Sequence, residues 1–88
     1  MNTKGAMQAT IELAQQRGMD RCLNKIPGMG YKHLYSMWTK VCFNDFSEAK
    51  LNRWLGWMQC AIVADGYATL EEMKELNRRY TDPTAEPV

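Results

Sequence analysis

The side chains in this sequence with the greatest capacity for chemistry are three cysteines and a single histidine. Cys22, Cys42 and Cys60 are separated by 20 and 18 residues, and His33 lies between the first two. These four residues could form a Cys3His zinc site, but structural zinc ligands normally come in close pairs, and no such pair occurs here. Three widely spaced cysteines also do not fit a disulfide framework. We therefore predict buried free thiols, with no metal and no cofactor.

A catalytic centre is not indicated either. His33 has no Asp or Cys at catalytic spacing, and the sequence contains no serine elbow, no phosphate loop and no paired-carboxylate motif. We interpret His33 as an exposed helix residue, because so short a chain offers little material for a pocket around it. The protein is therefore predicted not to be an enzyme.

The charge of the chain is balanced overall but not along its length. The 88 residues carry 11 basic and 10 acidic side chains. Residues 1–43 contain six basic and two acidic side chains, a net charge of +4, whereas residues 44–88 contain five and eight, a net charge of −3. The overall balance argues against a polyanion binder that relies on bulk charge. The first half could still present a local basic surface.

Length and hydropathy indicate one small domain outside the membrane. A chain of 88 residues is the size of a single domain. Its contents of 45% hydrophobic and 24% charged residues are typical of soluble globular proteins. The longest apolar run, residues 60–64, is far shorter than the roughly 18 residues that a membrane span requires. We predict a cytoplasmic protein with no membrane partner.

Helical periodicity dominates the chain and predicts an all-α fold, a compact bundle of four to five short helices. The bundle forms a single domain over residues 1–80. The tail at residues 81–88 is polar, contains two prolines and is predicted to be disordered. The expected helices cover residues 6–17, 20–25, 31–43, 48–64 and 70–80.

Local signals mark where these helices begin and end. Gly18 and Gly66 are expected to terminate helices, because glycine readily adopts the left-handed conformation of a helix end. Asp20 is expected to cap the short second helix and Ser47 the fourth. Thr69, in a Thr-Leu-Glu-Glu sequence, predicts a capping box at the start of the last helix.

Apolar stripes predict which helix faces form the core. The helix over 48–64 has one clean stripe. The helix over 31–43 has two, so it is either central in the core or half core and half interface, and the sequence leaves both open. The stripe of the helix over 48–64 consists of Leu51, Trp54, Leu55, Met58 and Ile62. The two stripes of the helix over 31–43 are Leu34, Met37, Trp38 and Val41, and Tyr31, Tyr35, Trp38 and Cys42. The inner face of the last helix consists of Leu70, Met73, Leu76 and Tyr80.

The sharpest local motif is an apolar-Pro-Gly-apolar-Gly turn at residues 26–30. Residues 23–34 resemble the helix-hairpin-helix family, which contacts the DNA backbone largely independently of sequence. In such a hairpin, backbone amides and the next helix N-terminus face a phosphate. The nucleic-acid-binding residues that the resemblance implies are Lys25, Gly28, Met29, Gly30 and Lys32.

The same turn has a simpler interpretation. Pro27 lacks a backbone donor and glycine tolerates positive φ, so the turn is also an efficient way to end one helix and begin another. Leu34 departs from the family pattern, which usually has a small residue at that position. Both the bare helix corner and the phosphate-binding hairpin remain open.

Large aromatic and methionine side chains are abundant for so small a domain. Trp54 and Met58 are expected to fill the core. Trp57 lies off the main stripe and is either an exposed anchor for a partner, or a cover for the core edge that stacks on Arg53. The predicted protein-binding residues are Trp57, Arg53, Tyr31, Tyr35 and Lys32.

A weaker resemblance concerns residues 47–80, which look like the C-terminal part of small proteins encoded by bacteriophages and prophages. It implies an accessory protein that inhibits or redirects a host protein or nucleoprotein machine by stoichiometric binding, without catalytic residues. This is the leading hypothesis for function. DNA-backbone binding through the turn at 27–30 is the alternative, and a homo-oligomer is a third.

Overall fold

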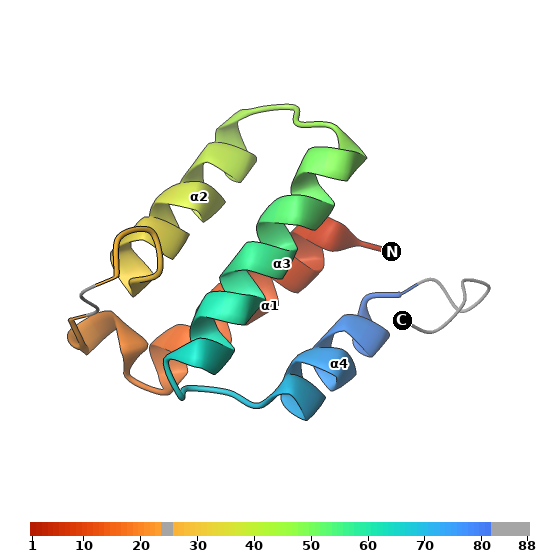
Figure 1. The fold of residues 1–88 in the computed structure, drawn as a ribbon. Helices are drawn as coiled ribbons and strands as arrows, with labels where there is room; N and C mark the ends of the chain where they lie inside the picture. Colours follow the sequence, from red (N-terminus) through yellow and green to blue (C-terminus); the bar gives the residue numbers. More distant parts are fainter. Residues whose placement is uncertain (24–25, 82–88) are drawn as a thin grey trace.

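The periodic apolar residues of the chain form four α-helices and one short 3-10 helix (Figure 1). In the computed structural model, which describes residues 1–23 and 26–81, no strand accompanies them. The all-α, single-domain prediction is therefore confirmed. The elements are α1 (Thr3–Gln16), the 3-10 helix η1 (Met19–Arg21), α2 (Tyr31–Phe43), α3 (Glu48–Ala64) and α4 (Leu70–Arg79).

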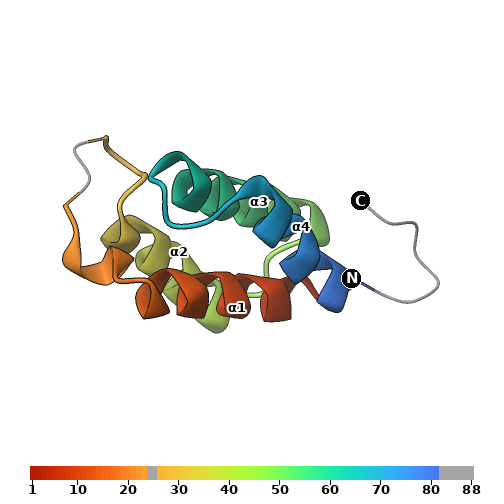
Figure 2. The ribbon, with the colours of Figure 1, turned by 90° about the horizontal axis from the view of Figure 1, so that it is seen from below.

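Helix α1 is the packing partner shared by all the other elements. It contacts η1, α2, α3 and α4, whereas α2 packs mainly on α1, η1 and α3. Figure 1 shows α1 behind α3, with α2 and α4 on opposite sides of α3. The view from below in Figure 2 shows the same order, with α1 spanning the molecule beneath the other helices. None of the helices in the described segments is long and apolar enough to cross a membrane.

The core is rich in methionine. Met7, Met19 and Met58 are essentially inaccessible to solvent, and α1 contributes Ala6 and Ala14 as small residues at its contacts. Thioether side chains are flexible and fill irregular gaps between helices. The expected stripe of α3 is buried at its four aliphatic and methionine positions, but Trp54 only packs against the edge of the core. The buried members are Leu51, Leu55, Met58 and Ile62.

The helix ends follow their local signals. Ser47 caps α3 by accepting a hydrogen bond from the Lys50 amide at 3.2 Å. Thr69 and Glu72 form the capping box of α4, since the Glu72 amide donates to Thr69 Oγ1 and the Thr69 amide to Glu72 Oε1, both at 3.1 Å. Gly66 adopts a φ of +83° just after α3. Residues next to each boundary therefore determine where α3 begins and ends and where α4 begins.

The prediction of a short helix over residues 20–25 is wrong, because the chain forms only the 3-10 helix η1 there. Gly18, at a φ of +88°, reverses the chain after α1, and Met19 then enters the core. The following 3-10 turn ends at Cys22, whose backbone is extended with a φ of −107° and a ψ of 144°. The buried position of Met19 directly after the turn at Gly18 favours a short 3-10 turn over a longer helix. Residues 24 and 25 lie outside the described residues, as do residues 82–88 of the expected tail.

The cysteines are also not where we expected them, because all three are exposed. Cys60 lies two residues from both Met58 and Ile62, and side chains two apart on a helix point in nearly opposite directions. Cys42 follows the buried Val41 and is turned outward. The hydrophobic character of cysteine therefore gave the wrong prediction of burial. For Cys42 and Cys60, the position on the helix determines the exposure.

The prediction that Leu70 belongs to the inner face of α4 is also wrong. It is 60% exposed, whereas Met73 and Leu76 of the same predicted inner face are buried. The apolar contact at this end of α4 is made instead by Ala68, just before the helix, which is 8% exposed. Leu70 thus belongs to the surface.

A partly buried set of amide and hydroxyl hydrogen bonds joins three helices. The Gln59 side-chain nitrogen donates to Thr10 Oγ1 of α1 at 3.2 Å and to Asn77 Oδ1 of α4 at 2.8 Å. Asn77 Nδ2 donates back to Gln59 Oε1 at 3.0 Å, and Thr10 Oγ1 donates to the Ala6 carbonyl at 2.7 Å. No buried side-chain nitrogen or oxygen in the described part of the chain lacks a partner. Because buried polar groups are costly unless satisfied, this set fixes how α4 lies on α1 and α3.

An ion pair attaches the beginning of α4 to the end of α1. Both guanidinium nitrogens of Arg17 donate to the Glu72 carboxylate, and Nη1 also donates to the Tyr67 carbonyl at 2.9 Å. The hydrogen bond from Arg17, followed by the backbone hydrogen bond from Thr69, lowers the pKa of Glu72 from 4.5 to about 2. Glu72 therefore completes the cap of α4 and anchors it to α1 with one carboxylate.

We expect a Glu72→Gln variant to lose acid dependence of stability. Because the pKa of Glu72 in the folded state is about 2, below its ordinary value of 4.5, its stabilising contribution is complete above pH 4.5 and is lost as the pH falls towards 2. Thermal melts followed by circular dichroism should show the largest difference in Tm between the parent and the variant at neutral pH. The difference should shrink between pH 4.5 and 2, and a constant difference would contradict the assignment.

Removal of one partner from the buried amide pair is expected to cost more than removal of both. Gln59→Leu leaves Asn77 without its side-chain partner, which should reduce the free energy of unfolding by about 1–3 kcal/mol. The double variant Gln59→Leu/Asn77→Leu should be less destabilised than the two single changes added together. Urea unfolding of the four proteins measures this coupling, and simple additivity would argue against a coupled pair.

Candidate functional site on α2 and α3

The side chain of Trp57 connects the turn before α2 to α3. Trp57 Nε1 donates a hydrogen bond to the Gly28 carbonyl at 2.8 Å. Gly28 has a φ of +84°, and a Cβ added there would lie 3.8 Å from Trp57 Cζ2 and 3.9 Å from His33 Nε2. Trp57 of α3 and His33 of α2 therefore approach the same glycine from two helices.

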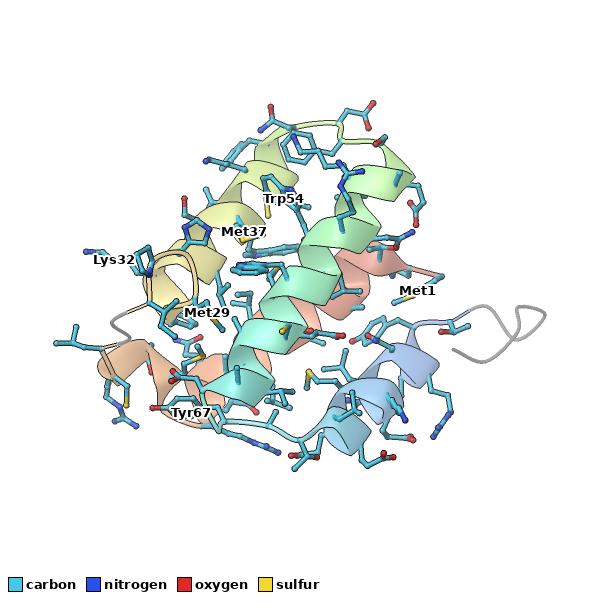
Figure 3. All side chains as sticks on the ribbon, in the orientation of Figure 1. Met1, Met29, Lys32, Met37, Trp54 and Tyr67 are labelled. Atoms are coloured by element: carbon cyan, nitrogen blue, oxygen red, sulfur yellow. The ribbon has the colours of Figure 1, made fainter. Side chains whose placement is uncertain are left out.

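Helix spacing places further side chains on the same sides of α2 and α3. Lys40 lies seven residues after His33, and Lys50 lies seven before Trp57, so each pair occupies one side of its helix about two turns apart. Arg53 precedes Trp57 by four residues and shares its side. In Figure 3, Trp54 and Met37 lie between α2 and α3. We call this surface the α2–α3 face and define it by His33, Lys40, Lys50, Arg53, Trp54 and Trp57.

Aromatic rings and a cation form a packed cluster at one end of the α2–α3 face. The rings of Phe46 and Trp54 are tilted with centroids 5.2 Å apart. Lys50 Nζ lies 3.9 Å from the Phe46 ring centre and 5.0 Å from that of Trp54, within the range of cation–π attraction. All three side chains are half-buried. The ammonium group is thus held at the surface in one place.

The electrostatic character of this face is positive. Helix α2 contains no acidic residue, and the one in α3, Glu48, accepts a hydrogen bond from Thr3 Oγ1 of α1 at 2.7 Å. Asp45 is an exposed carboxylate in the segment that joins the two helices. Among the residues that the structure describes, no carboxylate lies within ion-pair distance of Lys40, Lys50 or Arg53.

The structure divides the five predicted protein-binding residues between two surfaces. Trp57 and Arg53 lie on the α2–α3 face. Tyr31 and Tyr35 each stand two residues from His33 and therefore project from the opposite flank of α2, where their ring centroids are 5.9 Å apart. Lys32 extends from α2 away from α3 (Figure 3). These residues do not form one site.

Tyr31 also contacts the region of η1. Burial, and then the neighbouring charge of Asp20, raises the pKa of Tyr31. Tyr31 is half-buried, whereas Tyr35 is 50% exposed. This flank of α2 is therefore partly covered by the described part of the chain that precedes the turn.

Of the three tryptophans, Trp57 is the most exposed, at 45%, while Trp38 and Trp54 are half-buried at the core edge. The sequence left its exposure open, and the structure shows it to be exposed, in contact with Gly28, which was not foreseen. Sequence reasoning also missed Lys40, Lys50 and Phe46. The seven-residue spacing of Lys50 and Trp57 was a usable signal for the helical part of this face. Gly28 and Trp57 are 29 positions apart, and no local pattern indicated their contact.

The backbone of the turn at residues 27–30 is engaged within the protein. The Met29 amide donates to the Ile26 carbonyl at 3.2 Å, and the Met29 side chain packs against the core. The Gly30 carbonyl accepts from the His33 and Leu34 amides at 3.0 and 3.1 Å, which starts α2. Lys25 of the predicted phosphate site lies outside the described residues. The turn acts as a helix corner, and its phosphate-binding role stays a prediction.

Two further titratable side chains, those of Cys22 and Tyr67, interact next to η1. The hydrogen bond with Cys22, and after it burial, raises the pKa of Tyr67 to about 12. In the segments covered by the structure, no three His, Cys, Asp or Glu side chains are grouped so that they could hold a metal ion.

Comparison of the chain with protein-family models, curated proteins and solved structures gave no match. The resemblances to phage accessory proteins and to the helix-hairpin-helix family therefore remain predictions.

Trp57→Phe is expected to loosen the turn at residues 26–30 and to leave the fold intact. The change removes the indole donor to Gly28 but keeps an aromatic ring, so the cost should be about 0.5–1.5 kcal/mol. Hydrogen exchange of the Met29 amide should accelerate, while exchange in α1 should not. Trp54→Phe is the matched control, because no hydrogen bond from its indole holds the turn, and equal effects of both changes would contradict the assignment.

Proposed function

We propose that this chain is a non-enzymatic protein that binds a partner protein stoichiometrically through the α2–α3 face. The observation that carries the proposal is Trp57, which is half exposed and yet fixed by its hydrogen bond to Gly28. A large aromatic side chain held in one position loses little conformational freedom when a partner covers it. Tryptophan and arginine are also the residues that most often dominate the energy of protein interfaces.

The surroundings of Trp57 support the same proposal. Arg53 and Lys50 border it on α3, and the Phe46–Trp54 pair adds apolar area that is only half covered by the rest of the chain. An interface centre of aromatic and basic residues is typical of protein-binding surfaces. We expect such a protein to act by occupying its partner, in keeping with the predicted inhibition or redirection of a host protein or nucleoprotein machine.

The DNA-binding alternative has less support. The Met29 amide, which the hairpin interpretation directs at a phosphate, donates instead to the Ile26 carbonyl. The contact between Trp57 and Gly28 gives the turn a structural purpose that needs no phosphate. We therefore place protein binding first.

Trp57→Ala should reduce capture of the partner from nuclease-treated host lysate by more than tenfold, since a central anchor contributes about 2 kcal/mol or more. Tyr35→Ala is the matched control, because Tyr35 is similarly exposed but lies on the opposite flank of α2. It should leave capture unchanged. Trp57→Phe, which keeps a ring, should give an intermediate loss.

Circular dichroism of each variant verifies the fold, and sedimentation tests for a homo-oligomer. Loss of capture with Tyr35→Ala but not with Trp57→Ala would move the interface to the other flank. If neither change affects capture, or if the protein captures nothing, the proposed function is wrong.

A further inference from the structure

We infer that the partner segment covering the α2–α3 face is an acidic stretch of protein that also carries apolar side chains. The inference rests on the proposed function and adds the chemistry of the partner. It follows from the way charge and apolar surface are combined on this one face.

The first argument is the shortage of carboxylates on the α2–α3 face. On α1 and α4, three cations form the bridges Arg17–Glu72, Lys74–Glu71 and Arg78–Glu75, although Lys4 and Arg79 of these helices form none with the described residues. On the α2–α3 face, no described carboxylate pairs with Lys40, Lys50 or Arg53. The carboxylate of α3, Glu48, lies at the start of the helix and accepts a hydrogen bond from Thr3 of α1, and Asp45 lies in the segment before it. Complementary carboxylates are therefore left for a partner to supply.

The second argument is that one of these cations is already positioned. Lys50 Nζ lies over the Phe46 and Trp54 rings and is half-buried, which restricts its side chain before any partner arrives. A carboxylate that meets this ammonium group does not have to immobilise a freely moving lysine. Apolar side chains next to that carboxylate would meet the exposed part of Trp57.

The third argument separates an acidic protein from a nucleic acid. Affinity for a duplex grows with the number of phosphates neutralised, and nucleic-acid-binding domains usually carry a clear basic excess. This chain has a net charge of only +1, and three cations on the face would neutralise few phosphates. The half-covered tryptophans favour a partner with apolar side chains.

The test uses three defined probes and nitrogen-15-labelled protein in NMR titrations. The first probe is a short peptide that combines Glu and Asp with Leu and Phe. The second replaces each acid by its amide, and the third is a short DNA duplex. We expect the acidic peptide to shift amide resonances of α2 and α3, and to bind at least about tenfold more tightly than the other two at physiological salt.

Charge reversal provides the matched variants. Lys40→Glu combined with Arg53→Glu should abolish binding of the acidic peptide. Lys4→Glu combined with Arg79→Glu makes the same change of net charge on α1 and α4 and should leave binding within about twofold. Thermal melts confirm that both variants fold.

Each other outcome overturns the inference. Equal binding of the acid and amide peptides, or no binding of either, excludes an acidic segment, and tighter binding of the duplex replaces it with a nucleic acid. Equal losses in both charge-reversal variants would show that only net charge matters. Failure here, together with Trp57-dependent capture from lysate, would leave the proposed protein-binding function standing with a partner of different chemistry.

Discussion

The arrangement of this small domain depends on how the side-chain amide of Gln59 is satisfied. It lies in the core, and its nitrogen and oxygen find their partners on two other helices, Thr10 of α1 and Asn77 of α4. A buried amide accepts few alternative geometries, because any shift leaves a polar atom without a partner. The buried side of α3, which includes Gln59, therefore packs in one orientation against α1 and α4. What remains for solvent is the side that carries Trp57, and that side meets α2.

The same division explains why α2 has two different flanks. Leu34, Met37 and Val41 pack it against the core while its other side is exposed, so α2 is not central in the core, and an interface on its exposed side stays a prediction. On the side towards α3, the hydrogen bond from Trp57 to Gly28 links the corner before α2 to a helix that follows it in the chain. The α2–α3 face thus consists of residues from two helices, and the turn before α2 is attached to it through Trp57.

Local information was sufficient for much of this fold. The capping residues Ser47 and Thr69 and the spacing of the apolar residues in α3 are contained in short windows, and they predicted the elements correctly. Gln59 could have been recognised as well, because it lies four residues after Leu55 and three before Ile62, within the apolar stripe. The contacts that define the candidate site join residues far apart in sequence. The pairing of Gly28 with Trp57 has no local signal that could reveal it.

The abundance of methionine in the core has a consequence for how the sequence can change over time. Met7, Met19 and Met58 fill positions where leucine has nearly the same volume, and such exchanges usually cost less than about 1.5 kcal/mol. An unbranched thioether can also adjust its rotamer when a neighbour changes size. Substitutions in the interior can therefore accumulate in compensating steps, while the amide set around Gln59 tolerates few. Among descendants of this chain, we expect the polar interior residues to vary less than the apolar ones, the reverse of the usual pattern in a hydrophobic core.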